Sequence, residues 1–189
     1  MKMIDPLAWR VWSYARKWNM LDGLVLCAVS GGRDSMVMLR LLSALGAEGG
    51  FHIAAAHFNH RLRPTADRDE AFVRDWCREQ GIPLTCGAGD ARGFACREGL
   101  SVEDAARKLR YAFLESAARD MGADHIATAH HREDNAETVL LHLLRGTGLQ
   151  GLGGIAPVRG AIVRPLLETS RAEIDAYAAR NSVPYVEDE

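Results

Sequence analysis

The chain has 189 residues, 48% hydrophobic and 25% charged, with a formal net charge of −2. This composition is typical of a globular protein and argues against disorder, and no apolar run approaches the roughly 20 residues of a membrane-spanning helix. Because the net charge indicates no broad attraction to nucleic acid, an RNA substrate would need a local basic surface or a basic region outside this chain.

The N-terminal residues lack the apolar stretch and cleavage site of a secretory signal. The four cysteines form no C-x-x-C pair; they are Cys27, Cys77, Cys86 and Cys96. Such scattered cysteines in a chain without an export signal are typical of reduced thiols. We therefore expect a cytoplasmic protein with no membrane partner.

Short β-rich runs alternate with helical patterns along the chain. Continuous apolar runs predict buried strands at residues 24–29, 51–58 and 124–129, with a weaker strand at 83–86. Helices are predicted at residues 6–18, 34–45, 66–80, 101–121 and 133–145. A capping box from Ser170 to Glu173 begins a last helix, after which we expect one more short strand.

This alternation predicts an α/β fold with an open, mainly parallel, twisted sheet and helices on both faces. We expect residues 1–189 to form a single domain. In such sheets ligands bind beyond the carboxyl ends of the strands, at the switch point of the strand order. The segments that follow Val29, Phe58 and Ala129 should therefore meet in one crevice.

The sequence S-G-G-R-D-S lies between the first predicted strand and its helix. Glycines without a β-carbon let backbone N–H groups approach an anion closely. The free N–H groups of the helix that follows also favour phosphate oxygens, and the two serines add hydroxyl donors. We expect this segment, called the phosphate loop below, to bind phosphates through Ser30, Gly31, Gly32, Arg33, Asp34 and Ser35.

The phosphate loop is neither a Walker A sequence nor G-x-G-x-x-G. It resembles the PP-loop of ATP pyrophosphatases, which cleave ATP between the α- and β-phosphates to adenylate a carbonyl-type oxygen. The resemblance implies a Rossmann-like fold of the adenine nucleotide alpha hydrolase type, with the loop holding the leaving pyrophosphate. An aspartate among phosphates suits a bridging Mg²⁺, which makes Asp34 a predicted metal ligand.

A second group of polar side chains follows the strand predicted at residues 124–129. If a helix begins there, His130, Asp134 and Glu137 share one face and could hold Mg²⁺, orient an acceptor or move protons. The alternative is a solvated acidic helix N-terminus with a histidine that caps the strand. The shared crevice favours function. No spacing supports a zinc site built from histidines and a cysteine.

Several further segments narrow the resemblance. They are A-H-F-N-H-R-L-R at 56–63, E-D-A-A-R-K-L-R-Y at 103–111, H-x-x-x-D-x-x-E-T at 130–138, L-L-R-G-T-G-L-Q-G-L at 143–152 and R-P-L-L at 164–167. In this order they closely resemble the N-terminal catalytic domain of the tRNA(Ile)-lysidine synthases, from about Leu21 onward. The R-G-T-G-L-x-G-L segment followed by R-P-L-L points to this member of the superfamily.

The resemblance implies a two-step ligation. ATP adenylates C2 of the wobble cytidine in tRNA(Ile) with a CAU anticodon, and free L-lysine then displaces AMP to form lysidine. The implied ligands are ATP, Mg²⁺, lysine and this tRNA, and a homodimer is left open. The residues implied are Asp34, His130, Asp134 and Glu137 for catalysis, Asp34 and Asp134 for Mg²⁺, and His57, Asn59, His60, Arg107, Arg110 and Arg145 for ATP or tRNA contacts.

Some features of the chain depart from the family pattern or have a second interpretation. Glu133 stands where the family commonly has an aspartate, and Arg61 replaces a usual glycine. The chain stops where the family continues into the rest of the domain and C-terminal tRNA-binding domains. On the helix at 101–121, Arg107 and Arg110 could instead form an exposed ion-pair stripe with Glu103. Residues 146–149 could be only a helix C-cap and turn, or a flap over the site.

Three other functions are compatible with a PP-loop. A tRNA thiolase adenylates a base but generally needs reactive or cluster-binding cysteines, and the absence of C-x-x-C argues against it. A small-molecule amide synthetase is disfavoured by the R-G-T-G-L segment. A non-catalytic ATP-binding module would have no use for Asp34 and the acidic face at Asp134 and Glu137.

Overall fold

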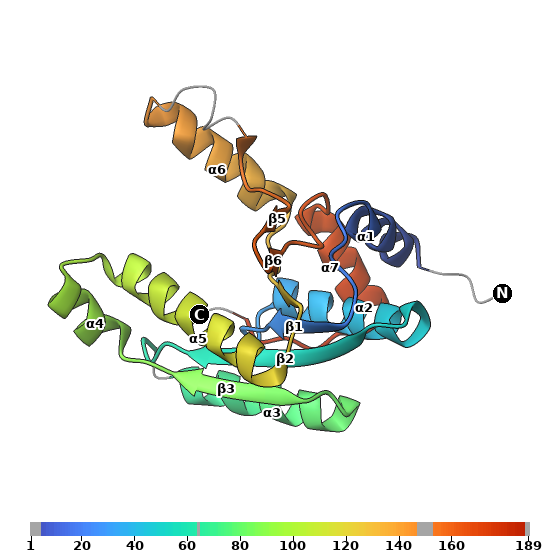
Figure 1. Ribbon diagram of the computed structural model, residues 1–189, viewed down its shortest axis with the longest axis horizontal. Helices are drawn as coiled ribbons and strands as arrows, with labels where there is room; N and C mark the ends of the chain where they lie inside the picture. Colours follow the sequence, from blue (N-terminus) through green and yellow to red (C-terminus); the bar gives the residue numbers. More distant parts are fainter. Residues whose placement is uncertain (1–4, 64, 147–152, 188–189) are drawn as a thin grey trace.

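A mainly parallel sheet forms the centre of the computed structural model, which describes residues 5–63, 65–146 and 153–187 (Figure 1). Within those residues the sheet has six strands in the order β3-β2-β1-β4-β6-β5. Neighbouring strands are parallel except for the edge pair β5 and β6. The strands are β1 (Leu24–Ala28), β2 (His52–Asn59), β3 (Leu84–Ala88), β4 (His125–Ala127), β5 (Val158–Arg159) and β6 (Ile162–Val163).

Helices cover both faces of the sheet, which confirms the predicted fold class. The larger hydrophobic core lies on one face, under α1, α2, α3 and α7, and a smaller one lies under α5 on the other. The helices are α1 (Pro6–Lys17), α2 (Arg33–Gly49), α3 (Ala66–Gln80), α4 (Ala91–Glu98), α5 (Val102–Met121), α6 (Arg132–Leu144) and α7 (Arg171–Arg180). No helix in these described ranges is long and apolar enough to cross a membrane.

The helices predicted before β1 and after each of the first four strands are present, as is the helix that begins at the Ser170 capping box. The sequence patterns missed α4, β5 and β6, because elements of eight or two residues are too short to show a period. The strand expected after the last helix is wrong. Residues 181–187 contain no strand, and the Val186 N–H instead donates to the Gly31 carbonyl at 3.0 Å.

The strand order reverses beside β1. From β1 the chain continues outward to β2 and β3 on one side, and β4 then returns to pair with the other side of β1. The carboxyl ends of β1 and β4 therefore flank the switch point, where an open α/β sheet leaves a crevice for ligands.

Helix α6 differs from the other helices. It extends away from the sheet in Figure 1, and none of its side chains is buried. It exposes four leucines, which are Leu140, Leu141, Leu143 and Leu144.

Candidate active site

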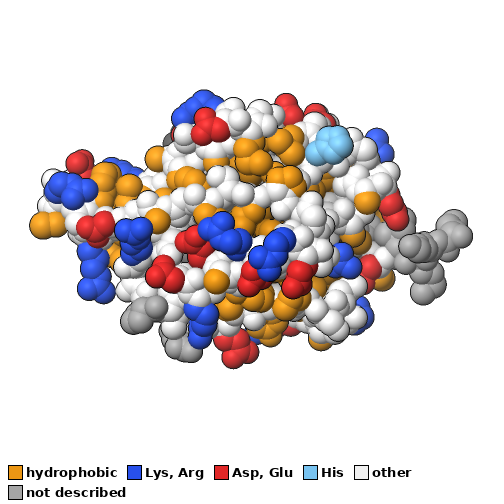
Figure 2. All heavy atoms as spheres, turned by 90° about the horizontal axis from the view of Figure 1, so that it is seen from below, with side chains coloured by type: hydrophobic (Ala, Val, Ile, Leu, Met, Phe, Trp, Pro, Cys, Tyr) orange, Lys and Arg blue, Asp and Glu red, His pale blue; other side chains and the backbone are white. Residues whose placement is uncertain are grey.

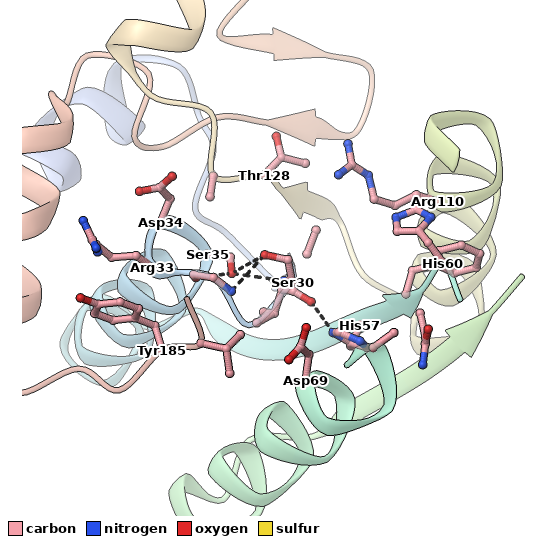
Figure 3. A pocket seen from close by; sticks show the side chains of 18 of the residues that line it. Ser30, Arg33, Asp34, Ser35, His57, His60, Asp69, Arg110, Thr128 and Tyr185 are labelled. Atoms are coloured by element: carbon pink, nitrogen blue, oxygen red, sulfur yellow. Dashed lines mark hydrogen bonds between the residues drawn. The ribbon is translucent and has the colours of Figure 1, made fainter. Parts of the chain in front are cut away.

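A pocket of about 740 Å³ lies beyond the carboxyl ends of β1, β2 and β4 (Figure 3). It occupies the crevice that the strand order predicts. The residues predicted from the sequence that line it are Ser30, Gly32, Arg33, Asp34, Ser35, His57, Asn59, His60, Arg110, His130 and Asp134. Segments far apart in the sequence thus meet in one cavity.

The phosphate loop, residues 30–35, is held by its own serines. The Ser35 hydroxyl accepts the Ser30 N–H at 3.1 Å and donates to the Gly32 carbonyl at 2.8 Å, while the Ser30 hydroxyl accepts the Gly32 N–H at 3.2 Å. Helix α2 begins at Arg33, and its N-cap residue Gly32 supplies no side-chain hydrogen bond. The N–H groups of its first turn are therefore open to an anion, as the helix dipole favours.

The chain after α7 crosses the outside of the loop. Gly31 has φ +95°, and a β-carbon there would lie 3.0 Å from Val186 Cγ2, so both the backbone and the contact favour glycine. The Arg33 guanidinium stacks 4.6 Å from the Tyr185 ring centroid and pairs with Asp175 at 2.6 Å. Arg33 thus links the loop to α7 and to this segment, and the N–H groups remain the donors for phosphate.

Asp34 lies in the first turn of α2 and lines the pocket. Burial raises the pKa of its carboxyl above the ordinary value, and the nearby Arg171 and His131 oppose that shift. Its Oδ2 lies 3.4 Å from Arg171 and 3.6 Å from His131 Nε2, but its buried Oδ1 has no hydrogen-bond partner within the described residues. A buried carboxylate oxygen without a donor fits a cation ligand.

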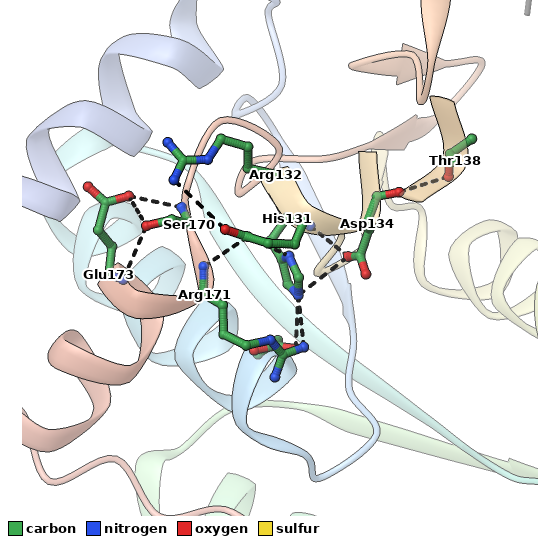
Figure 4. Close-up of polar contacts among 9 residues, drawn as sticks. His131, Arg132, Asp134, Thr138, Ser170, Arg171 and Glu173 are labelled. Carbon is green, nitrogen blue, oxygen red and sulfur yellow. Dashed lines mark hydrogen bonds and ion pairs between the residues drawn. The ribbon is translucent and has the colours of Figure 1, made fainter. Parts of the chain in front are cut away.

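His131 is the centre of a polar group that we call the histidine cluster, comprising His131, Asp34, Glu133, Asp134 and Arg171. Figure 4 shows His131 beside Asp134 and Arg171. The His131 side chain is 2% exposed. Its Nε2 lies 3.0 Å from an Arg171 nitrogen and 3.7 Å from Asp134 Oδ2, and its Nδ1 lies 3.1 Å from Glu133 Oε2. Glu133 also accepts the Arg171 N–H at 2.9 Å, which joins the N-termini of α6 and α7.

Asp134 has both a structural contact and a place in the pocket. Its Oδ2 accepts the His131 N–H at 2.8 Å and so caps α6, which agrees with the interpretation of this segment as an acidic helix N-terminus. The same carboxylate lines the pocket beside Asp34. Since α6 begins at Arg132, His130 precedes the helix and does not share its face with Asp134.

His130 lies in the pocket wall. Its Nδ1 is 3.0 Å from the Thr128 hydroxyl. Burial first, and then the positive charges of Arg164, Arg110 and Arg107, lower the pKa of His130 to about 4, with Asp134 acting in the opposite direction. The imidazole is therefore neutral at neutral pH and is a weak base there.

The end of β2 forms another part of the wall. His57 is buried, its Nδ1 lies 2.9 Å from the Val29 carbonyl, and burial lowers its pKa, so the neutral ring donates that hydrogen bond between β2 and β1. Asn59 donates to Asp67 at 2.9 Å and accepts the Arg61 N–H at 2.9 Å. Both side chains line the pocket and also hold its wall together.

His60 and Arg61 follow in the same turn. Burial and then Arg110 lower the pKa of His60 to about 4, and its ring packs edge-on against Phe58 with centroids 4.9 Å apart. Arg61 has φ +53°, a left-handed conformation that explains why the family pattern has glycine there.

The remaining predicted residues lie elsewhere. Glu137 and Arg145 are exposed on α6 and at its C-terminal end, outside the pocket lining. Arg107 is exposed on α5, where it stacks on Tyr111 and forms no ion pair with Glu103. Most of the predicted flap, residues 147–149, and the rest of the R-G-T-G-L-x-G-L segment lie outside the described residues.

Sequence reasoning missed two members of the histidine cluster. The only signal for His131 was its place beside His130, and Arg171 had none, because it is 137 positions from Asp34 and 40 from His131. Tyr185 and Thr128 also line the pocket without having been predicted.

Residues 5–63, 65–146 and 153–187 contain no group of three or more His, Cys, Asp or Glu side chains arranged to hold a metal ion. Mg²⁺ needs fewer, since it commonly takes one or two carboxylates together with substrate phosphates. None of the four cysteines lines the pocket, and burial raises the pKa of the Cys77 thiol to about 11.

Comparison with known sequences gives one family and a consistent set of relatives. The family model described as the PP-loop domain matches residues 15–189. A tRNA(Ile)-lysidine synthase of Petrotoga mobilis is 43% identical over 164 residues, which is 87% of this chain and 53% of that protein. One from Bacteroides thetaiotaomicron is 42% identical over 95% of this chain and 42% of that protein. This chain thus spans about half the length of these curated relatives.

Comparison with solved structures supports the fold alone, because the sequence identities are low. The U34-tRNA thiolase NcsA from Methanococcus maripaludis, solved with its [4Fe-4S] cluster, matches with a TM-score of 0.81 and 16% identity. The match covers 97% of this chain and 65% of that one. An NH3-dependent NAD synthetase from Campylobacter jejuni matches with a TM-score of 0.62 and 15% identity, covering 95% of this chain and 75% of the other.

Proposed function

We propose that this chain, which belongs to the PP-loop domain family, is the ATP-using catalytic domain of a tRNA(Ile)-lysidine synthase. In this proposal it adenylates C2 of the wobble cytidine of a CAU-anticodon tRNA(Ile) and ligates free lysine there. The observation that carries the chemistry is the meeting of an uncapped helix N-terminus and two carboxylates, Asp34 and Asp134, in one pocket. The similarity to named lysidine synthases supports the choice of substrate.

The phosphate loop is suited to hold the pyrophosphate that leaves. The hydroxyl groups of its two serines form hydrogen bonds within the loop. The open N–H groups at the start of α2 are therefore the donors available to phosphate oxygens. Because these donors are fixed before ATP arrives, they stabilise the charge that develops as the α–β bond breaks without reorganising.

The residues at the pocket fit a magnesium ion. Asp34 with its unpaired Oδ1, together with Asp134, would hold it against the phosphates. When bound, Mg²⁺ supplies charge neutralisation for the reacting phosphates. Arg171 and His131 contact Asp34 and orient its carboxylate toward this task.

His130 and Glu137 have proposed roles in the second step. The ammonium of lysine must lose a proton before its amine attacks, but a pKa of about 4 makes His130 a weak base for that step. The neutral ring in the pocket wall would instead hydrogen-bond the α-phosphate that leaves with AMP. Glu137, exposed on α6, would attract the positive side chain of lysine toward the pocket.

A lysine-transfer assay tests the proposal. The chain is incubated with ATP, labelled lysine and unmodified CAU-anticodon tRNA, and label is then sought in the RNA. We expect ATP-dependent incorporation that a GAU-anticodon tRNA does not support. The longer relatives make a second arm necessary, in which the assay is repeated with the full-length Petrotoga mobilis protein carrying this chain's residues in place of its own matching region. No lysine transfer in either arm, with ATP still bound, contradicts the proposal.

A further inference from the structure

Three arginines surround the ring of Tyr111, and one of them, Arg110, lines the pocket. Their guanidinium carbons lie 5.1 Å (Arg107), 5.4 Å (Arg110) and 5.9 Å (Arg159) from the ring centroid. Arg107 and Arg110 lie on α5, and Arg159 is the last residue of β5. Within the described part of the chain none of the three pairs with a carboxylate, whereas most arginines of α2, α3 and α7 do.

Arg164, at the end of β6, adds a buried positive charge to this group. Its residue is 4% exposed, it donates to the Ala156 carbonyl, and its Nε has no hydrogen-bond partner among the described residues. Burial lowers the pKa of Arg164; Tyr111 opposes this shift, and the charges of Arg159 and Arg107 act in the same direction as burial. A buried guanidinium without an acid beside it is costly unless an anion binds nearby.

These four residues, the arginine cluster, lie away from the phosphate loop. Figure 3 shows Arg110 and His60 on the α5 side of the pocket, with Arg33 and Asp34 on the opposite side. His130, which also lines the pocket, feels the charges of Arg164, Arg110 and Arg107. The arginine cluster and the phosphate loop thus offer two separate places for phosphate.

The rest of the surface explains why a local site is needed. The net charge is −2, and on the face seen in Figure 2 acidic and basic side chains are interspersed. A polyanion therefore gains little from the protein as a whole and must be held by particular groups. Guanidinium groups are well suited, because they bind phosphate in a bidentate manner, and stacking on Tyr111 limits their freedom before the ligand arrives.

We propose that Arg107, Arg110, Arg159 and Arg164 form a second phosphate site, which binds a backbone phosphate of the RNA substrate beside the nucleotide that enters the pocket. This inference rests on the proposed function, since it takes RNA as the substrate. The phosphates of ATP bind at the phosphate loop, on the first turn of α2. The arginine cluster therefore contributes to RNA affinity and little to ATP affinity.

The test uses the two exposed members, whose replacement leaves the core intact. Arg107→Gln/Arg159→Gln is compared with Arg92→Gln/Arg119→Gln, which removes the same charge from exposed positions on α4 and α5. Binding of a CAU-anticodon stem–loop RNA is measured by fluorescence anisotropy from ~50 to ~200 mM KCl. Binding of ATP is measured by calorimetry, and melting temperatures confirm folding.

We expect the first pair to weaken RNA binding at least about tenfold at low salt and to make the slope of log K against log salt shallower by about 1 to 1.5. The control pair should leave both close to wild type, and ATP affinity should stay within about twofold in all variants. Equal losses for both pairs, a loss of ATP affinity in place of RNA affinity, or no RNA binding by the wild-type chain would each overturn the site. RNA binding without lysine transfer would instead count against the proposed function.

Discussion

The phosphate loop and the histidine cluster face the same pocket but are built in different ways. The hydrogen bonds of the two loop serines join residues within five positions of each other. The histidine cluster joins the starts of α2, α6 and α7, with Asp34 and Arg171 separated by 137 positions. The loop is thus specified locally, whereas the cluster exists only once the sheet and its helices have assembled.

The difference has a functional meaning. A loop shaped by its own residues presents N–H donors even when the pocket is empty. The cluster instead places the carboxylates of Asp34 and Asp134 on the same His131 ring, with Arg171 beside Asp34. The pKa values of such coupled groups change when a ligand or a proton binds.

The largest expected effect comes from removing the carboxylate that both regions share. Asp34→Ala should reduce ATP-dependent pyrophosphate release more than about 100-fold, because charge stabilisation by a metal site contributes several kcal/mol. The melting temperature should not fall, since burial already disfavours the ionised carboxylate in the fold. Asp175→Ala, which loses only the partner of Arg33, is the control. Wild-type turnover in Asp34→Ala refutes the role assigned here.

A smaller loss is expected when the cluster alone is disturbed. Arg171→Gln removes the contacts at 3.0 Å to His131 and 3.4 Å to Asp34, and charge-assisted bonds of this kind contribute about 1.5–3 kcal/mol. We expect kcat for pyrophosphate release to fall about 10- to 100-fold, with ATP affinity changing less. The neighbouring exposed Arg132→Gln should be nearly neutral. If the two variants behave alike, the cluster does not position Asp34.

The loop can be disturbed with a matched glycine. Gly31→Ala and Gly50→Ala both place alanine at positive φ, which costs about 1–2 kcal/mol of unfolding free energy. Only Gly31 also faces Val186, at 3.0 Å from the added β-carbon, whereas nothing lies within 4 Å of it at Gly50. Denaturant titration and ATP binding should therefore separate the two, with weaker ATP binding in Gly31→Ala alone. Equal ATP affinity in the two variants would show that the contact with Val186 does not shape the phosphate loop.

A different kind of effect is expected from pH, through the titration of His130. Since the folded-state pKa of His130 is about 4 and its unfolded value is about 6.5, the unfolded chain binds the proton first as pH falls. Stability should therefore decline below about pH 6.5, by at most about 1.4 kcal/mol per pH unit for this group. His130→Gln should flatten the decline between about pH 6.5 and 5, measured by urea denaturation, whereas the exposed His52→Gln should not. An unchanged slope in His130→Gln contradicts the low pKa.

Much of the fold followed from the sequence alone. The apolar runs at β1, β2 and β4 and the periodic patterns of α2, α3 and α5 are long enough to show their period. The short elements α4, β5 and β6 are not, and they form because the neighbouring layers hold them in place. The strand expected after α7 is absent from residues 181–187 because the Val186 N–H donates to the phosphate loop and not to a neighbouring strand.

The sequence by itself determined the phosphate loop, because two glycines and two serines between a buried strand and a helix shape the backbone locally. It also determined that the segments after β1, β2 and β4 share one edge, since parallel strands place their carboxyl ends together. Only the tertiary structure decided that His131 and Arg171 join Asp34, that His130 stays neutral, and that three arginines gather around Tyr111. These features depend on burial and on contacts between distant segments, which one-dimensional spacing does not encode.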